Sequence, residues 1–348
     1  MTRTAVLICP GRGTYNATEL GYLARHHGQR SGLIDLFDAQ RAALGQETLT
    51  ALDGAERFSM AKYSRGDVAS PLIFSCAFAD VHALDEDIEI VAVTGNSMGW
   101  YIALAASGAL SAKDGFEVVN TMGHLMQDHL IGGQLVYPCQ SADWQLDRPR
   151  KDELLQLVSD INQREHHQLA LSIDLGGMLV LAGNDTGLAA FEKAVPVLQD
   201  RFPMRLPNHA AFHTELQAPV AAEGRARLPV TLFQQPKTPM IDGRGYIWWP
   251  SADPMEELWS YTLDTQIVES YDFTRAVQVA AREFAPDLFI VTGPGTTLGG
   301  AVAQSLIQIG WQGLSGKADF KTRQAQDPIV VSMGDAEQRA PVSHNGRG

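Results

Sequence analysis

The sequence has few cysteines, no long hydrophobic run and no excess of positive charge. Its 348 residues include only three cysteines, Cys9, Cys76 and Cys139, and they form no CxxC pair. This excludes a zinc site of the CxxC type, and an odd, sparse count fits a reducing cytoplasm. No apolar run reaches about 18 residues and the first residues are too few for a signal peptide, so we expect a cytoplasmic protein without a membrane span.

Acidic residues outnumber basic ones. Asp and Glu number 40 against 27 Lys and Arg, which gives a formal net charge of −13 at pH 7. Nucleic acids and anionic membranes bind basic surfaces, so we expect neither as a partner. Hydrophobic residues make up 45% and charged residues 19% of the chain, which is the balance of an ordinary globular protein.

Four short apolar runs, each bounded by Gly or Pro, predict buried strands. Three of them are followed by a Gly-containing turn and a helix-like segment, which is typical of a parallel α/β sheet. A nearly continuous apolar segment, 71–84, predicts a buried helix with Pro71 at its first position. The predicted strands are Ala5–Cys9, Ile88–Thr94, Met178–Ala182 and Leu288–Thr292.

The composition changes in the middle of the chain. Asp143–His167 is charged and polar, and Lys151–Ile161 has the apolar spacing of a helix. A strand-like segment, Leu169–Leu175, and a helix near Thr186–Leu198 follow. This order of elements predicts a small α+β subdomain over 126–205.

The domain prediction follows from this insertion. Segments 1–125 and 206–320 are expected to form one large α/β subdomain around the inserted 126–205. The polar segment 321–348 lacks periodicity and is predicted to be a mobile tail, with Ile329–Val331 as an edge strand if it docks.

The strongest local signal is Gly95-Asn96-Ser97-Met98-Gly99, a G-x-S-x-G motif between a predicted strand and a predicted helix. The glycines allow a sharp turn that lifts Ser97 to the N-terminus of the helix, where free N–H groups favour negative charge. The Met98 N–H is then placed to donate to an oxyanion. The alternative is a glycine-rich turn that carries a solvated serine.

A serine nucleophile needs a base, and the chain has ten histidines. His213 and His209 lie in a loop-like segment after Pro207, from which a side chain can reach a cleft. Spacing alone does not choose between them.

Two further Gly-rich turns follow predicted strands, Cys9–Thr14 and Gly293–Leu298. Each is either a tight turn or a phosphate cradle. At the ends of parallel strands, both are expected to line the same crevice as Ser97.

Together these segments resemble the malonyl-CoA:acyl carrier protein transacylase family and the acyltransferase domains of polyketide synthases. The resemblance extends over roughly residues 4–315, and seven ordered motifs carry it. They are Pro10–Gly13, Gly95–Tyr101, Gly123–Gln127, Ala182–Asn184, Ala211–Thr214, Gln266–Val277 and Gly293–Leu298.

The resemblance implies a fold and a mechanism. The fold is a hydrolase-like α/β parallel-sheet core with an inserted, small ferredoxin-like subdomain. Ser97, with His213 as base, takes an acyl group from acyl-CoA and passes it to the phosphopantetheine thiol of an acyl carrier protein, in fatty acid or polyketide synthesis. The main-chain carbonyl of Gln266 orients His213, and the N–H groups of Arg12 and Met98 form the oxyanion hole. The family implies no tightly bound cofactor, no metal and a monomer.

The departures from the family concern the acyl pocket. The family's arginine, which binds the malonyl carboxylate, aligns with Met122, and a methionine cannot bind a carboxylate. Ser70, Asn96 and Trp100 also replace polar family residues of other types. We therefore expect a more apolar pocket and an acyl group without a carboxylate.

Two other functions use the same residues. An acyl hydrolase that clears carrier proteins differs only in that water resolves the acyl-enzyme, and a non-catalytic module would bind the carrier without chemistry. Because carrier proteins are acidic, docking needs a local basic patch. The candidates for this patch are Arg148, Arg150, Lys151, Arg201 and Arg205.

Overall fold

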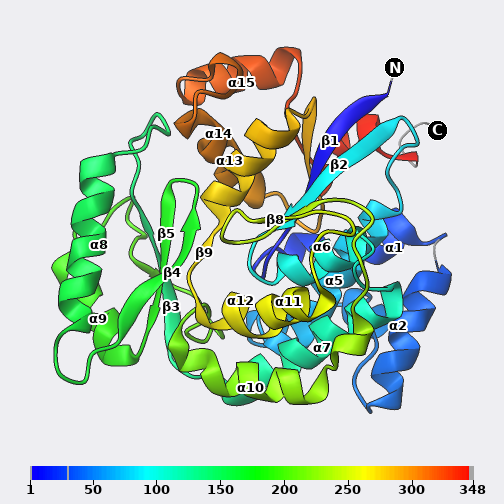
Figure 1. Cartoon of the computed structure of the whole chain (residues 1–348), viewed down its shortest axis with the longest axis horizontal. Coiled ribbons are helices and arrows are strands. Elements are labelled where there is room, and N and C mark those ends of the chain that lie inside the picture. Colours follow the sequence, from blue (N-terminus) through cyan, green and yellow to red (C-terminus); the bar gives the residue numbers. More distant parts are fainter. Residues whose placement is uncertain (1, 30, 345–348) are drawn as a thin grey trace.

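The computed structural model describes residues 2–29 and 31–344, and two sheets organise them (Figure 1). The larger sheet has six strands within these residues, in the order β11-β10-β1-β2-β7-β8. All neighbours pair in parallel except β7 and β8. Its strands are β1 Arg3–Cys9, β2 Ile88–Gly95, β7 Met240–Ile241, β8 Ile247–Trp248, β10 Leu288–Val291 and β11 Val330–Ser332.

Helices cover both faces of this sheet, which explains why its central strands are continuously apolar. Ala5 and Leu7 of β1 belong to one hydrophobic core, and Val6 and Ile8 belong to another. On the first face pack α5 Gly66–Val81, α6 Gly99–Ala106 and α7 Ala112–His129; on the second pack α13 Phe273–Phe284 and α14 Leu298–Gln308.

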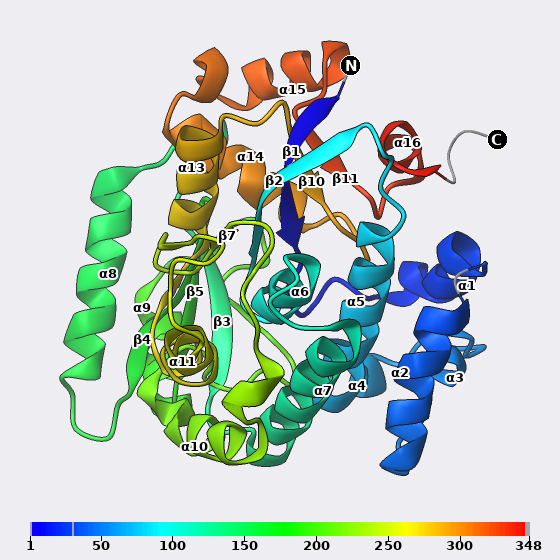
Figure 2. The same cartoon turned by 45° about the vertical axis from the view of Figure 1, so that its right-hand side comes forward.

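The second sheet has five strands among the described residues, in the order β6-β3-β5-β4-β9. Its pairs are antiparallel apart from β4 with β9. The outer face packs on α8 Arg148–Asn162 and α9 Asp185–Ala194, and Figure 2 shows α8 at the edge of the molecule. The strands are β3 Gly133–Pro138, β4 Leu169–Leu175, β5 Met178–Gly183, β6 Met204–Arg205 and β9 Tyr271–Asp272.

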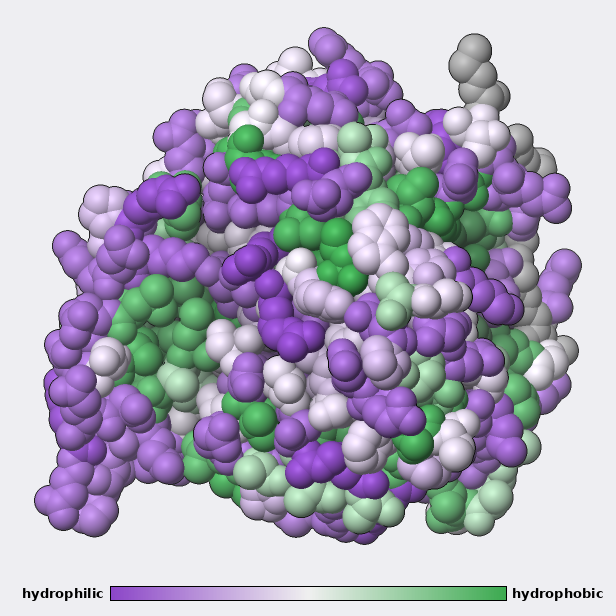
Figure 3. Space-filling model, viewed as in Figure 1, coloured by the Kyte–Doolittle hydropathy of each residue, from purple (hydrophilic) through white to green (hydrophobic). Residues whose placement is uncertain are grey.

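The first four strands of this sheet in chain order lie within 126–205, and β9 joins from the large part of the chain. The subdomain boundaries 126–205 stay a prediction. In Figure 3 the molecular face over this region is mostly hydrophilic, with a hydrophobic area beside α8. The other helices are α1 Tyr22–His27, α2 Ser31–Ala43, α3 Leu49–Asp53, α4 Met60–Tyr63, α10 Ala218–Arg227, α11 Met255–Ser260, α12 Gln266–Val268, α15 Lys317–Gln326 and α16 Ala336–Arg339.

The four predicted strands and the predicted helices are found, but Pro71 is not at the first position of its helix. Helix α5 begins at Gly66, so Pro71 lies in its interior. A proline there leaves the carbonyl of Asp67 without its helical N–H donor. The side chain of Arg41 donates to this carbonyl instead, at 3.1 Å, which explains why the helix tolerates the proline.

The prediction of a mobile tail over 321–348 is wrong for the residues up to 344; 345–348 lie outside the described residues. Strand β11 pairs in parallel with β10, as the edge-strand alternative predicted. Arg339 is buried, and its guanidinium pairs with the buried carboxylate of Asp80 at 2.7 Å. Asp80 also accepts hydrogen bonds from Tyr22 and the Gly293 N–H. This cluster fixes the C-terminal segment to α1, α5 and the turn after β10.

No helix in the described part of the chain is both long and apolar enough to cross a membrane.

Replacing Arg339 by methionine is expected to destabilise the protein by about 3–5 kcal/mol, because the buried carboxylate of Asp80 loses its guanidinium partner and keeps only His27 as an ion-pair partner. Urea unfolding measures this difference. Arg323→Met removes an exposed pair with Asp327 and is expected to change stability by less than about 0.5 kcal/mol. Equal effects of the two substitutions would contradict the buried role of Arg339.

Candidate active site

Ser97 lies in the turn between β2 and α6, and close packing shapes this turn. Its φ of 56° is in the left-handed region, where few residues other than glycine are found. A Cβ on Gly99 would lie 2.2 Å from the Cys9 carbonyl oxygen, and one on Gly11 would lie 2.7 Å from the Asn96 carbonyl oxygen. Glycine is required at both positions, because the turn after β1 packs directly on the Ser97 turn.

His213, and not His209, contacts the serine. Ser97 Oγ lies 2.7 Å from His213 Nε2, and His213 Nδ1 lies 2.6 Å from the main-chain oxygen of Gln266. A carbonyl oxygen can only accept, so Nδ1 carries the proton and Nε2 is free to accept the Ser97 hydroxyl proton. His209 instead bonds Gln134 through Nδ1, at 2.8 Å.

Gln266 holds both members of the pair. Its side-chain amide donates to the Ser97 carbonyl at 3.1 Å, and the His213 N–H donates to the neighbouring Ile267 carbonyl at 3.0 Å. The Tyr101 hydroxyl donates to the Gln266 amide oxygen at 3.4 Å. Residue 266 therefore fixes the serine turn with its side chain and the imidazole with its main chain.

His213 is 4% exposed, and this burial decides its charge. Burial lowers the pKa of His213 to about 4, although the hydrogen bond to the Gln266 carbonyl opposes the shift. The imidazole is therefore neutral at neutral pH, which is the state that a general base requires.

Arg12 and Met98 lie beside the serine, and their role as an oxyanion hole stays a prediction. Both residues line a small cavity of about 20 Å³ beside Ser97 and His213. Within the described residues, neither main-chain N–H donates to another group. Two free N–H groups near a nucleophile can stabilise a developing oxyanion.

The Arg12 side chain also faces this region. Its guanidinium donates to the carbonyls of Ser64 and Asn208 and lies 5.4 Å from the centre of the Phe212 ring. Burial lowers the pKa of Arg12 to about 10, so it stays charged at neutral pH. In the described part of the chain no carboxylate forms an ion pair with it, and its Nε has no hydrogen-bond partner.

A larger cleft of about 410 Å³ opens from Ser97 between the two sheets. Aliphatic and aromatic side chains form most of its wall, including Val136, Val180 and Met178 from the inner face of the second sheet. The turn after β1 and Thr297 from the turn after β10 also line it, as the position of these turns at strand ends predicts. As far as the structure describes this wall, it contains no Asp or Glu.

Of the four predicted acyl-pocket residues, only Asn96 lines the large cleft. Ser70, Trp100 and Met122 are buried in the core and line neither the large cleft nor the small cavity. The Trp100 indole donates to Thr262 at 3.0 Å. Met122 packs against α10, where a Cβ on Gly224 would lie 2.8 Å from its sulfur. Ser70, Trp100 and Met122 therefore pack in the core and do not form the wall of the cleft.

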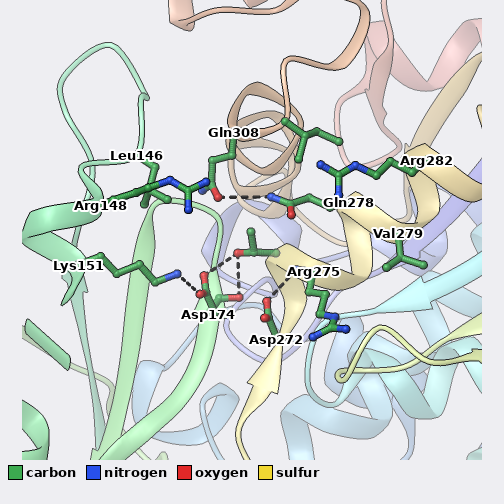
Figure 4. Close-up of a pocket in the computed structure, with 12 residues that line it drawn as sticks. Leu146, Arg148, Lys151, Asp174, Asp272, Arg275, Gln278, Val279, Arg282 and Gln308 are labelled. Carbon is green, nitrogen blue, oxygen red and sulfur yellow. Dashed lines mark hydrogen bonds and ion pairs between the residues drawn. The ribbon is translucent and has the colours of Figure 1, made fainter. Parts of the chain in front are cut away.

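The predicted basic patch is largely paired with acids. Arg150 pairs with Glu153, and Lys151 with Asp174, in and beside a second cleft of about 520 Å³ that Figure 4 shows between α8 and α13. Arg148 lines this second cleft, away from the serine. Arg205 pairs with Glu192 at 2.8 Å.

Among the five candidate basic residues, Arg201 lines the cleft that contains Ser97. It is exposed, lines the large cleft of Ser97, and lies 4.9 Å over the Phe202 ring. The sequence alone does not distinguish Arg201 from the other four candidate residues.

No motif or spacing in the sequence singles out Gln134 and Ser172. They lie on β3 and β4, on either side of β5, and form a buried hydrogen bond of 2.7 Å behind the cleft. Only their placement in the second sheet connects them with the histidine loop.

No family model matches the chain. Over 211 residues, or 60% of the chain, it is 26% identical to the malonyl CoA-acyl carrier protein transacylase of Bacillus subtilis, and the match spans 62% of that enzyme, less than two thirds of its length. The structure matches the malonyl-CoA:acyl carrier protein transacylase of Xanthomonas oryzae pv. oryzae with a TM-score of 0.74 and 18% identity, over 99% of this chain and 100% of that one. The chain resembles the malonyl-CoA:acyl carrier protein transacylases and has their fold.

A second transacylase structure supports the same fold. It is the complex of a type II polyketide synthase acyl-carrier protein with its malonyl-transacylase, and it matches with a TM-score of 0.69 and 18% identity, over 88% of this chain and 94% of that one. The transacylase fold accounts for the parallel sheet and the second sheet together.

The low pKa of His213 predicts that the rate of Ser97 acylation falls only at unusually acidic pH. The rate of Ser97 acylation should be constant between about pH 8 and 5 and should fall about tenfold per pH unit below about 4, where the imidazole binds a proton. Single-turnover quench experiments on protein shown to be folded by circular dichroism measure this rate. A midpoint near the ordinary histidine value of about 6.5 would contradict the burial argument.

Proposed function

We propose that this chain is an acyltransferase that moves an acyl group from acyl-CoA, through a Ser97 acyl-enzyme, to the phosphopantetheine thiol of an acyl carrier protein. The observation that carries the proposal is the line from Ser97 Oγ through His213 to the Gln266 carbonyl. This arrangement activates a serine without a carboxylate.

The first half-reaction follows from this geometry. His213 Nε2 takes the Ser97 proton as Oγ attacks the thioester carbonyl, and the N–H groups of Arg12 and Met98 face the resulting oxyanion. The C–S bond then breaks, and the protonated His213 returns the proton to the departing CoA sulfur. The second half-reaction runs in reverse, with the carrier thiol as the nucleophile.

The acyl group is proposed to lack a carboxylate. The residue in the position of the family's carboxylate-binding arginine is Met122, which is fully buried in the core. The cleft wall is mostly apolar, so it favours an aliphatic acyl chain. Arg12 lies beside the serine, and its guanidinium already donates to two carbonyl groups.

Intact-protein mass spectrometry tests this proposal. After incubation with acetyl-, hexanoyl- and malonyl-CoA, we expect an adduct with the first two that is absent in Ser97→Ala. Added holo carrier protein should then remove the adduct and gain the acyl mass. Loss of the adduct to water alone would indicate a hydrolase, and no adduct would favour a binding module.

The incubation with malonyl-CoA tests the class of acyl group separately. A malonyl adduct that forms with the native protein and is lost in Arg12→Met would assign the carboxylate to Arg12. That result would contradict the proposal of a non-carboxylated acyl group and leave the acyltransferase reaction in place.

Arg201 is proposed to contact the acidic carrier. Arg201→Glu should slow transfer to the carrier about tenfold or more, because a favourable charge contact becomes repulsive at the mouth of the cleft. Acylation by an uncharged N-acetylcysteamine thioester should not change. Arg150→Glu is the matched control, since Arg150 lies outside this cleft; equal slowing by both variants would contradict a specific contact.

A further inference from the structure

A hydrogen-bonded relay runs behind the cleft wall. The Ser172 hydroxyl lies 2.8 Å from the main-chain oxygen of Phe212, and Gln134 Nε2 lies 2.7 Å from Ser172 Oγ. Gln134 Oε1 lies 2.8 Å from His209 Nδ1. The relay thus connects β4, β3 and the loop that carries both histidines.

The carbonyl of Phe212 fixes the direction of every bond in this relay. This carbonyl can only accept a hydrogen bond, so the Ser172 hydroxyl donates its single proton to the carbonyl. Ser172 Oγ must then accept a hydrogen bond from the Gln134 NH₂ group. The amide oxygen of Gln134 therefore faces His209, and His209 Nδ1 must donate to it. In the neutral imidazole, Nε2 is then a bare hydrogen-bond acceptor.

Nothing in the described part of the chain uses this acceptor. His209 lines the large cleft of Ser97 and is partly exposed there. Nε2 has no hydrogen bond within the described residues, and it is not among the buried unpaired atoms. Burial and the charge of Arg12 hold the pKa of His209 well below its usual range, so the ring stays neutral.

The surroundings restrict what can bind to Nε2. Arg12 and His209 both contact the Phe212 ring, with centres 5.4 Å and 5.9 Å away. A carboxylate brings no donor and would face the Nε2 lone pair, whereas an N–H or O–H group donates to it. Substrates of the proposed reaction carry such a group, since the pantetheine arm of both CoA and the carrier contains amide N–H groups.

We propose that His209 is a positioning residue that accepts, at Nε2, a hydrogen bond from a donor of the thioester substrate. The donor to which we commit is an amide N–H of the pantetheine arm. A hydroxyl on the acyl chain would supply the same chemistry. The inference rests on the proposed function, because the thioester must pass through this cleft to reach Ser97.

Steady-state acylation kinetics test the proposal with two substitutions. His209→Phe, which has no acceptor, should raise KM about five- to tenfold and leave kcat nearly unchanged, as expected for one neutral hydrogen bond. His209→Gln restores an acceptor and should recover most of the loss. His166→Phe, an exposed histidine, is the matched control. An unchanged KM in folded His209→Phe would overturn the proposal.

A pair of substrates identifies the donor. Butyryl-CoA and 3-hydroxybutyryl-CoA differ by one hydroxyl, and both carry the same arm. An equal rise in KM for both assigns the amide N–H, and a rise confined to the hydroxylated substrate assigns the hydroxyl. The first pattern supports the proposal, and the second overturns its commitment to the amide N–H, because the KM for butyryl-CoA would then be unchanged in His209→Phe.

Nitrogen NMR of histidine-labelled protein separates this proposal from the proposed reaction. The His209 signals should show the neutral Nδ1–H form, and S-propyl-CoA, which cannot acylate the serine, should shift Nε2. Adenosine 3′,5′-bisphosphate, which lacks the arm, should not. A shift without any Ser97 acylation would keep the His209 contact and reject the acyltransferase. Acylation of Ser97 without a shift of the His209 Nε2 signal, together with an unchanged KM in His209→Phe, would keep the acyltransferase and reject the His209 contact.

Discussion

The main-chain carbonyl of Gln266 determines the chemistry of the site, because it can only accept a hydrogen bond. It fixes the His213 proton on Nδ1 and leaves Nε2, 2.7 Å from Ser97 Oγ, as a base. A carboxylate in this place would favour the charged imidazolium, whereas a neutral carbonyl leaves burial free to lower the pKa of His213. The same rule, applied to the Phe212 carbonyl, sets the orientation of His209 through two intervening side chains.

The two sheets share the construction of this site. The large sheet supplies the serine turn and the neighbouring turn of Arg12, which touch so closely that glycine is required at 11 and 99. The second sheet supplies the inner wall of the cleft and the relay that holds the histidine loop. His213 packs against Tyr271 of β9, with ring centres 5.4 Å apart, so the second sheet also contributes to the burial that lowers the pKa of the imidazole.

Features set by local sequence could be predicted, and those set by distant partners could not. The strand, G-x-S-x-G turn and helix around Ser97 all lie within the continuous segment 88–106. The choice of His213 over His209 depends on Gln266, which is 53 positions from His213. The packing of the C-terminal segment up to residue 344 depends on the pair between Arg339 and Asp80. The family resemblance predicts Trp100 and Met122 in the acyl pocket, but their helices place both side chains in the core.

In the proposed reaction, the acyl group rests covalently on Ser97 between two separate substrates. Initial rates measured with acyl-CoA and holo carrier protein both varied test this step. We expect parallel lines in double-reciprocal plots, because each substrate meets a different form of the enzyme. Lines that intersect would show that both substrates must be bound together, and would contradict the acyl-enzyme mechanism.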